Sequence, residues 1–200
     1  MLRVFLSLFS KGSCIIVKRR DYLNTLQSET NKMIIAALFL ALGLIIPYFT
    51  THMFGLPGVI FLPMHIPVLM AGLLLGPKYG AIVGFLTPLL SSILTGMPPM
   101  YPVLPGMLVE LTVYGFVSGW IRHNQGWGLY PALVIAMLFG RIASGLIFAP
   151  LFFGQTFGAQ FQILIGNIVT GLPGIIIQLL FVPALVYFVE KVLSNRRIYD

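Results

Sequence analysis

The chain has 200 residues, of which 58% are hydrophobic and 8% are charged, and its mean hydropathy is +0.97. A water-soluble domain of this size could not cover so much apolar surface, so the composition excludes a soluble fold and indicates an integral membrane protein. The formal net charge of +7 would suit a nucleic-acid partner, but the basic residues gather mostly at the two ends of the chain. There they flank apolar segments, as membrane proteins require for their orientation, and we expect no nucleic-acid partner.

Residues 1–32 are polar to mixed and precede the first long apolar segment. A short apolar run at the start comes before the basic residues Lys18, Arg19 and Arg20, which is the reverse of the order in a secretory signal peptide. We therefore interpret residues 1–32 as a cytoplasmic N-terminal extension, to which the sequence assigns no role.

Six apolar segments follow, each near the roughly 20 residues that a helix needs to cross a hydrocarbon core of about 30 Å. They cover residues 33–49, 58–75, 79–95, 101–121, 130–150 and 162–190. Their apolar character is continuous and does not alternate, which favours helices over the strands of a barrel. The last segment is long and is interrupted by Gly171, Pro173 and Pro183, which predicts a short re-entrant or interfacial piece followed by a bent spanning helix.

The predicted fold class is an all-α integral membrane protein with six transmembrane helices over residues 33–192 and a cytoplasmic tail at 193–200. The loops at about 50–57, 96–100 and 151–161 contain no Lys, Arg, Asp or Glu. With six spans, every basic loop residue then falls on the opposite side of the membrane. By the positive-inside rule, both termini are expected in the cytoplasm.

The predicted outer loop Gly96-Met97-Pro98-Pro99-Met100-Tyr101-Pro102 is stiff and apolar. Two interpretations of it stay open, namely a lid over an outward-facing pocket and a tight connection that lies at the lipid interface.

Two charged residues stand in the middle of apolar segments: Glu110 in the fourth and Arg141 in the fifth. A charge at the centre of a membrane span costs about 2.5–3.5 kcal/mol on insertion scales, so such residues usually face a partner, a water-filled cavity or a ligand. At a rise of about 1.5 Å per residue, both reach mid-membrane on consecutive antiparallel helices. They are therefore predicted either to form a buried ion pair that fixes packing or to contact a ligand, with Arg141 suited to a carboxylate or phosphate.

Asn167, Gln178 and His65 are further candidates for ligand contact, because an unpaired buried polar group is costly. The alternative for each is a hydrogen bond inside the protein. The sequence has no HExxH motif and no Cys/His spacing, so neither a metal site nor a cofactor is expected. It also has no GxxxxGK[ST] motif and no GxSxG motif, so we expect no enzyme activity and place any ATP-driven motor on other chains.

Ala37 and Ala41 lie four residues apart in the first segment and therefore on one face of a helix. Small residues at this spacing let another helix approach closely, either inside the protein or from a partner subunit.

In combination, these stretches resemble the substrate-binding S component of energy-coupling factor (ECF) vitamin transporters, over residues 33–190. The stretches that carry the resemblance are Ala37 to Ala41, LPMHIPVLMAGLLLGPKYGAIVGFLTPLL at 62–90, GMPPMYP at 96–102, MLVELTVYGFVSGW at 107–120, GRIASG at 140–145 and NIVTGLPGIIIQ at 167–178.

The resemblance implies a six-helix subunit of a bacterial plasma membrane that captures a vitamin or related micronutrient from outside. It places the pocket on the outer side, among the later helices. It also implies that Ala37 and Ala41 face a transmembrane coupling subunit, and that two cytoplasmic ATPase subunits drive a cycle in which the S component topples in the membrane.

The substrate stays open between two chemical types. Arg141 favours a carboxylate such as that of pantothenate, with Glu110 as its counter-ion or as a partner of a ligand hydroxyl. A neutral benzimidazole that stacks on Tyr101 or Tyr114 is the alternative. Other functions that the sequence admits are a self-sufficient secondary carrier or channel, and a membrane enzyme or assembly protein.

Overall fold

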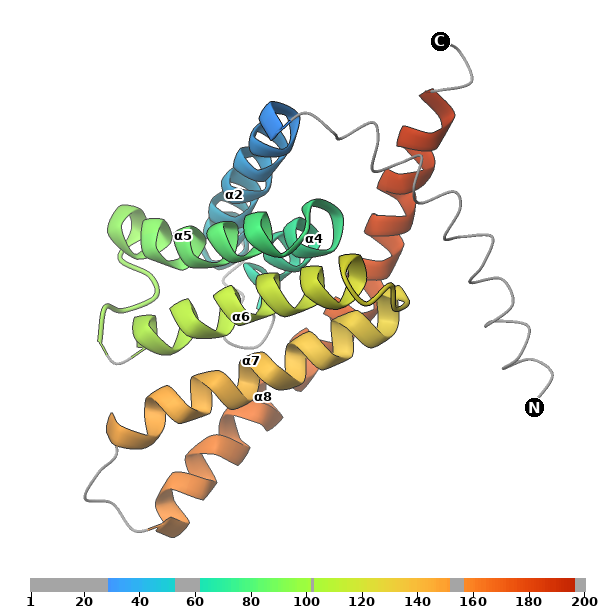
Figure 1. The fold of residues 1–200 in the computed structure, drawn as a ribbon. Coiled ribbons are helices and arrows are strands. Elements are labelled where there is room, and N and C mark those ends of the chain that lie inside the picture. The colour runs from blue at the N-terminus through green and yellow to red at the C-terminus, as the bar shows by residue number, and fades with distance from the viewer. Residues whose placement is uncertain (1–28, 53–61, 102, 152–156, 197–200) are drawn as a thin grey trace, which may run out of the picture.

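The computed structural model describes residues 29–52, 62–101, 103–151 and 157–196, with side chains described outside 51–52, 148–151, 157–170 and 193–196. All regular secondary structure in these ranges is helical (Figure 1). The helices are α2 (Glu29–His52), α4 (His65–Leu75), α5 (Pro77–Thr95), α6 (Val103–His123), α7 (Leu129–Leu151) and α8 (Phe157–Arg196). The predicted all-α fold is thus confirmed for the described residues.

Five of these helices contain a stretch that is long and apolar enough to cross a membrane, and α4 is the exception with 11 residues. A helix was predicted over residues 58–75. Among the residues of this range that the structure describes, the prediction is wrong for 62–64, which form a turn. Leu62 has a φ of +48°, and the next residue, Pro63, lacks a backbone N–H. A helix cannot run through this pair, so α4 starts only at His65, whose N–H donates to the Leu62 carbonyl.

The last apolar segment is a single helix of 40 residues, α8, in which Pro173 and Pro183 are internal. The predicted re-entrant piece is therefore wrong, whereas the interfacial alternative and the bend stay predictions. Neighbouring helices in a membrane protein satisfy the backbone groups that proline frees, so proline does not have to end a helix there. At about 1.5 Å per residue, α8 is roughly 60 Å long.

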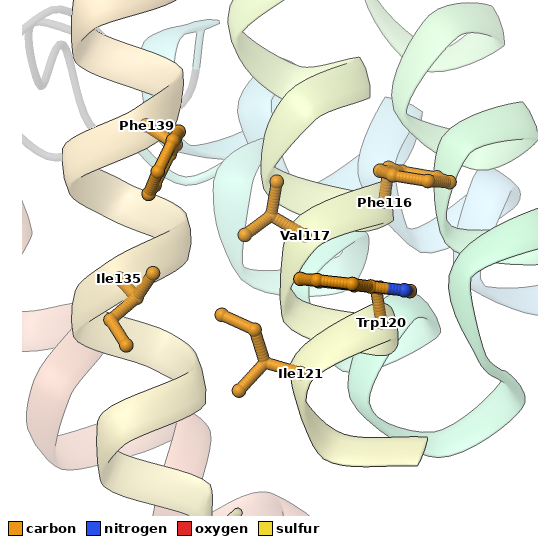
Figure 2. Close-up of a pocket in the computed structure, with 6 residues that line it drawn as sticks. All are labelled: Phe116, Val117, Trp120, Ile121, Ile135 and Phe139. Carbon is orange, nitrogen blue, oxygen red and sulfur yellow. The ribbon is translucent and has the colours of Figure 1, made fainter. Parts of the chain in front are cut away.

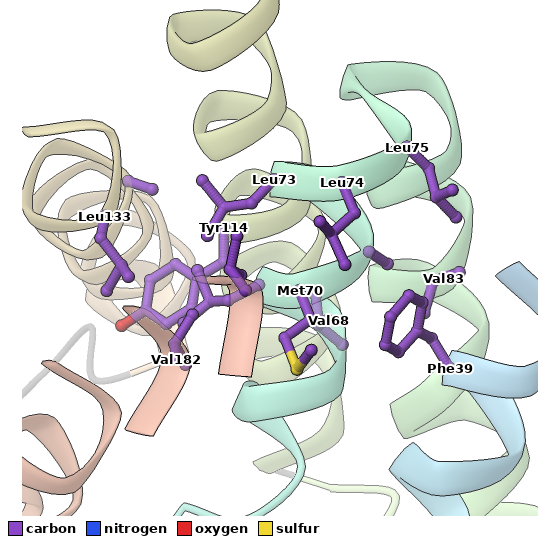
Figure 3. Close-up of a cluster of buried hydrophobic side chains, with 14 of the residues drawn as sticks. Phe39, Val68, Met70, Leu73, Leu74, Leu75, Val83, Tyr114, Leu133 and Val182 are labelled. Atoms are coloured by element: carbon purple, nitrogen blue, oxygen red, sulfur yellow. The ribbon is translucent and has the colours of Figure 1, made fainter. Parts of the chain in front are cut away.

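The short helix α4 lies at the centre of the bundle, and all its residues except Ile66 are buried. Figure 3 shows Leu73 of α4 near the ring of Tyr114 from α6, with Leu133 of α7 and Val182 of α8 in the same cluster. Four helices therefore meet around one buried tyrosine, and that tyrosine belongs to the site described below.

Helices α5 and α6 touch through their backbones at Gly80 and Gly115. A Cβ atom on either glycine would overlap the backbone of the other. Small residues allow this approach, and close van der Waals packing is what holds helices together where lipid removes the hydrophobic driving force between them. The glycines of this region thus fix the position of α6, which carries Glu110.

Three contacts between helices lie at the end of the bundle where α4 passes into α5. Tyr79 of α5 donates to the Glu29 carboxylate of α2, and Arg122 of α6 forms an ion pair with Glu190 of α8. The His123 ring Nε2 lies 3.1 Å from the Leu73 carbonyl of α4. Helix α2 therefore begins, and helix α8 ends, at the same end of the bundle.

Replacing Gly115 with alanine is expected to lower stability by about 1–3 kcal/mol, because the added Cβ would press α6 away from the backbone of Gly80. The measurement is the midpoint of thermal unfolding in detergent. Gly128 to alanine is the matched control, since the nearest atom to its added Cβ is Pro131 Cδ at 3.6 Å. Equal midpoints for the two variants would contradict the close packing of α5 and α6.

Candidate functional site

Glu110 lies at the centre of a polar cluster built from three helices. Its Oε1 atom is 3.2 Å from Arg141 Nε of α7 and accepts a hydrogen bond of 2.9 Å from the Tyr114 hydroxyl. His65 of α4 places Nε2 at 3.6 Å from the same oxygen, which is too long for a hydrogen bond. Glu110 is 6% exposed and His65 1%, whereas the Arg141 side chain is 21% exposed, so the cluster is buried apart from part of the arginine. The two charges that were predicted at mid-membrane therefore meet, together with two of the other predicted residues.

Helical spacing and one glycine bring these groups together. Glu110 and Tyr114 are four residues apart on α6 and so share one face. Across from them on α7, a Cβ on Gly140 would overlap the Tyr114 ring. Because Gly140 leaves room for that ring, α7 comes close enough for the neighbouring Arg141 to reach Glu110.

Several polar atoms of this cluster have no hydrogen-bond partner among the described residues. They are the donors Arg141 Nε and Nη2 and the two ring nitrogens of His65, all shielded from solvent. Arg141 Nε is close to Glu110 but is not aligned for a hydrogen bond. A buried polar atom without a partner costs about 1–3 kcal/mol, and the guanidinium donors are therefore suited to an incoming acceptor.

Helix α8 borders the cluster through Gly171. A Cβ on Gly171 would lie 3.0 Å from Arg141 Nη2, so the glycine leaves space for the guanidinium group. Gln178 comes seven residues later, which is about two turns and hence the same side of the helix. It is 1% exposed, and its Nε2 has no hydrogen-bond partner in the described part of the chain. Gln178 is thus a buried donor on the side of α8 that faces Arg141.

The other predicted site residues are not brought into this cluster by any described contact. Tyr101 is 69% exposed, next to the outer loop. Asn167 belongs to α8, but its side chain lies outside the described residues. Tyr114, in contrast, lies in the cluster. It was predicted as a surface for stacking a ligand, but its ring is buried against Gly140 and its hydroxyl is bonded to Glu110.

The loop after α5 is tied to the end of that helix. The Ser91 hydroxyl donates to the Met97 carbonyl at 2.7 Å, and the Ser92 hydroxyl donates to the Pro98 carbonyl at 2.8 Å. These bonds favour the tight connection over the lid, the two interpretations that the sequence left open.

Ala37 and Ala41 are both exposed on α2, whereas Ala36, Phe39 and Gly43 of the same helix are buried. The described structure therefore leaves the two alanines on an outward face, where a partner helix has access to them.

Sequence reasoning missed the roles of Gly140, Gly171 and the residue pairs at the end of the bundle. Arg122 was counted only as a loop charge, and Glu190 and Glu29 were not considered as partners. A glycine directly before a mid-membrane arginine was the available signal, since small residues mark close approaches between helices.

A wholly apolar groove of about 390 Å³ lies elsewhere, between α6 and α7. Figure 2 shows its lining residues, which are Phe116, Val117, Trp120, Ile121, Ile135 and Phe139. None of them belongs to the polar cluster, and the groove offers no polar group to a solute.

The apolar helices define a multi-pass α-helical membrane protein with a charged cluster in its interior. The family model described as ECF transporter, substrate-specific component, matches residues 31–186. The chain therefore belongs to this family, and the resemblance predicted from the sequence is confirmed. Members are substrate-binding subunits of transporters rather than enzymes, and they work with an ECF module on a small-molecule substrate. Neither the curated proteins nor the solved structures gave a match to this chain.

Proposed function

We propose that this protein captures a vitamin-like micronutrient from outside a bacterial cell and binds it at the cluster around Glu110 and Arg141. The observation that carries the proposal is the set of unsatisfied polar atoms on Arg141 and His65, next to a buried carboxylate. Buried charges in membrane proteins are retained mainly where they serve a ligand or a transport path. Gln178, and Asn167 with it, extends the proposed site along α8.

Arg141 is the group that contacts the substrate most directly in this proposal. Its guanidinium offers a planar fork of donors that fits a carboxylate. A pantothenate-like acid is therefore favoured over a benzimidazole-like neutral ring, because Tyr114 is buried and its hydroxyl is engaged, leaving Tyr101 for stacking. Glu110 holds Arg141 in place until the substrate arrives.

The proposed orientation puts both termini in the cytoplasm. The joint end formed by Glu29, Tyr79, Arg122 and Glu190 supports it, since the start of α2 and the end of α8 lie together there. That end also carries Lys32, Lys78 and Lys191, as the positive-inside rule requires of the cytoplasmic side. The membrane domain is proposed to span residues 33–192, between the extension 1–32 and the tail 193–200.

Delivery into the cell is proposed to need a transmembrane coupling subunit and two ATPase subunits. The exposed Ala37 and Ala41 would form part of the surface that meets the coupling subunit.

The test is to purify the protein from its membrane, identify the small molecules that co-purify with it by mass spectrometry, and measure transport in proteoliposomes. We expect one tightly bound solute, and ATP-dependent uptake of that solute only when the coupling and ATPase subunits are present. Accumulation against a gradient by this protein alone would contradict the proposal and favour a self-sufficient carrier.

A further inference from the structure

Glu110 and Arg141 carry opposite charges, so this pair is electrically balanced before a ligand enters. The neighbouring His65 imidazole can gain a positive charge by binding a proton, and the Tyr114 hydroxyl donates to Glu110. No other charged side chain of the described residues contacts the cluster. On the helices packed against α4, the other described titratable groups are Glu29, Lys32, Lys78, Tyr79, Arg122, His123, Tyr187, Glu190 and Lys191 near the joint end, and Tyr48 and Tyr130, which are exposed.

The cluster holds a buried donor that no described residue satisfies. Arg141 Nη2 can only donate and has no hydrogen-bond partner among the described residues, and Gln178 Nε2, about two turns beyond Gly171 on α8, is a second such donor. The acceptor Glu110 Oε1, in contrast, is already approached from three sides. A ligand that satisfies this site must bring acceptor atoms, and a carboxylate brings two oxygens in the geometry of the arginine fork.

A second carboxylate in the cluster creates a charge problem. Two carboxylates and one guanidinium leave a net negative charge in a buried site, and an uncompensated buried charge is strongly unfavourable. Of the described groups in the cluster, His65 is the one that can add a positive charge near neutral pH. Its Nε2 lies 3.6 Å from Glu110, and both ring nitrogens lack a hydrogen-bond partner in the described structure.

We infer that the substrate is a carboxylic acid bound as its anion, and that its binding is coupled to the uptake of one proton by His65. This inference rests on the proposed function. The proton comes from bulk water and binds the free nitrogen of the imidazole, while the ligand stays deprotonated. The loaded site then holds two positive and two negative charges, with the imidazolium paired to Glu110 and the guanidinium released toward the ligand.

The test compares acids with their own uncharged amides. Isothermal titration calorimetry of the purified protein in detergent uses pantothenate, nicotinate and biotin, and the primary amide of each, together with benzimidazole. Each titration is repeated in two buffers of different ionisation enthalpy, which gives the number of protons taken up, and at several values between pH 6 and pH 9.

We expect at least one acid to bind at least about a hundredfold more tightly than its amide, with close to one proton taken up on binding at the upper end of the pH range. Its Kd should rise by about tenfold per pH unit in that range, because each bound anion requires one bound proton.

Two variants test whether His65 takes up the proton and whether the negative charge of Glu110 makes that proton necessary. His65→Gln should reduce proton uptake to near zero and make the affinity for the acid independent of pH. Glu110→Gln removes the competing negative charge, so the arginine alone balances the acid and proton uptake should vanish there too. Because the second variant keeps His65, the test stands even where the first variant does not fold, which size-exclusion chromatography reveals.

Three results overturn the inference. One is an acid that binds wild-type protein without proton uptake, and another is an amide or benzimidazole that binds as tightly as any acid. The third is a co-purified solute without a carboxylate when no acid binds. None of these three results contradicts the proposed function, which is the capture of a solute. If no probe binds and no solute co-purifies, the proposed function itself fails and the inference fails with it.

Discussion

Replacing Arg141 with alanine is expected to lower the affinity for the co-purified solute by at least about a hundredfold. Loss of one partner of a buried, hydrogen-bonded charge pair costs about 2–5 kcal/mol in binding, and a hundredfold corresponds to about 2.7 kcal/mol. The effect should be large here because Arg141 holds the two unsatisfied guanidinium donors of the cluster and lies against Gly171 of α8. The measurement is the Kd of the variant in detergent, by calorimetry.

The same change also removes the counter-ion of Glu110, and an unpaired buried carboxylate destabilises the fold. The double variant Arg141→Ala with Glu110→Gln is therefore the matched control, because it leaves no unpaired charge at the centre of α6. We expect the double variant to recover the thermal midpoint of the wild-type protein but not its affinity. Normal binding by the folded double variant would mean that the ion pair only fixes packing.

Replacing both Ala37 and Ala41 with tryptophan is expected to reduce ATP-dependent uptake more than tenfold while ligand affinity stays within about twofold of wild type. Both alanines are exposed on α2, and the residues of that helix that pack inside are others, such as Phe39. Bulky side chains would prevent the close helix approach that small residues allow. Uptake is measured in proteoliposomes with the partner subunits, and affinity is measured on the isolated protein.

The control for this variant is Leu180→Trp, which adds a similar ring at an exposed position of α8. We expect normal uptake and normal binding from it, since the change leaves the face of α2 intact. If the alanine double variant lost ligand binding, its face would have to pack within the subunit. If it transported normally, the partner would have to dock on another surface.

The sequence predicted the class of protein and the helical segments because both depend on local hydropathy. A chain with 58% hydrophobic residues has to place its apolar runs in lipid, and in lipid only a helix or a closed barrel satisfies the backbone. Five of the six predicted spans were found as helices of sufficient length for this reason. The costs of Glu110 and Arg141 at mid-membrane are also local, so these residues stood out without a structure.

What the sequence could not decide is set by contacts between helices. The short α4 depends on the backbone of Leu62 and Pro63, and α8 continues through Pro173 and Pro183, which a membrane environment with neighbouring helices allows. Hydropathy along the chain does not report either effect. The apolar run at 58–75 and the proline-interrupted run at 162–190 were therefore the two segments whose helical bounds were mispredicted.

From the sequence, Glu110 and Arg141 were predicted as two charges at the same depth, each costly to place in a membrane. The tertiary structure decided which residues surround them. Gly140 admits the ring of Tyr114, and the late start of α4 puts His65 beside Glu110. These arrangements depend on shifts of an ångström or less in how helices cross, because interiors are close-packed and only a glycine fits at the tightest point. The cost of placing a charge in the membrane thus singles out Glu110 and Arg141 in the sequence. Close packing of the helices, in contrast, determines which residues surround the pair and which of its donors lack a partner.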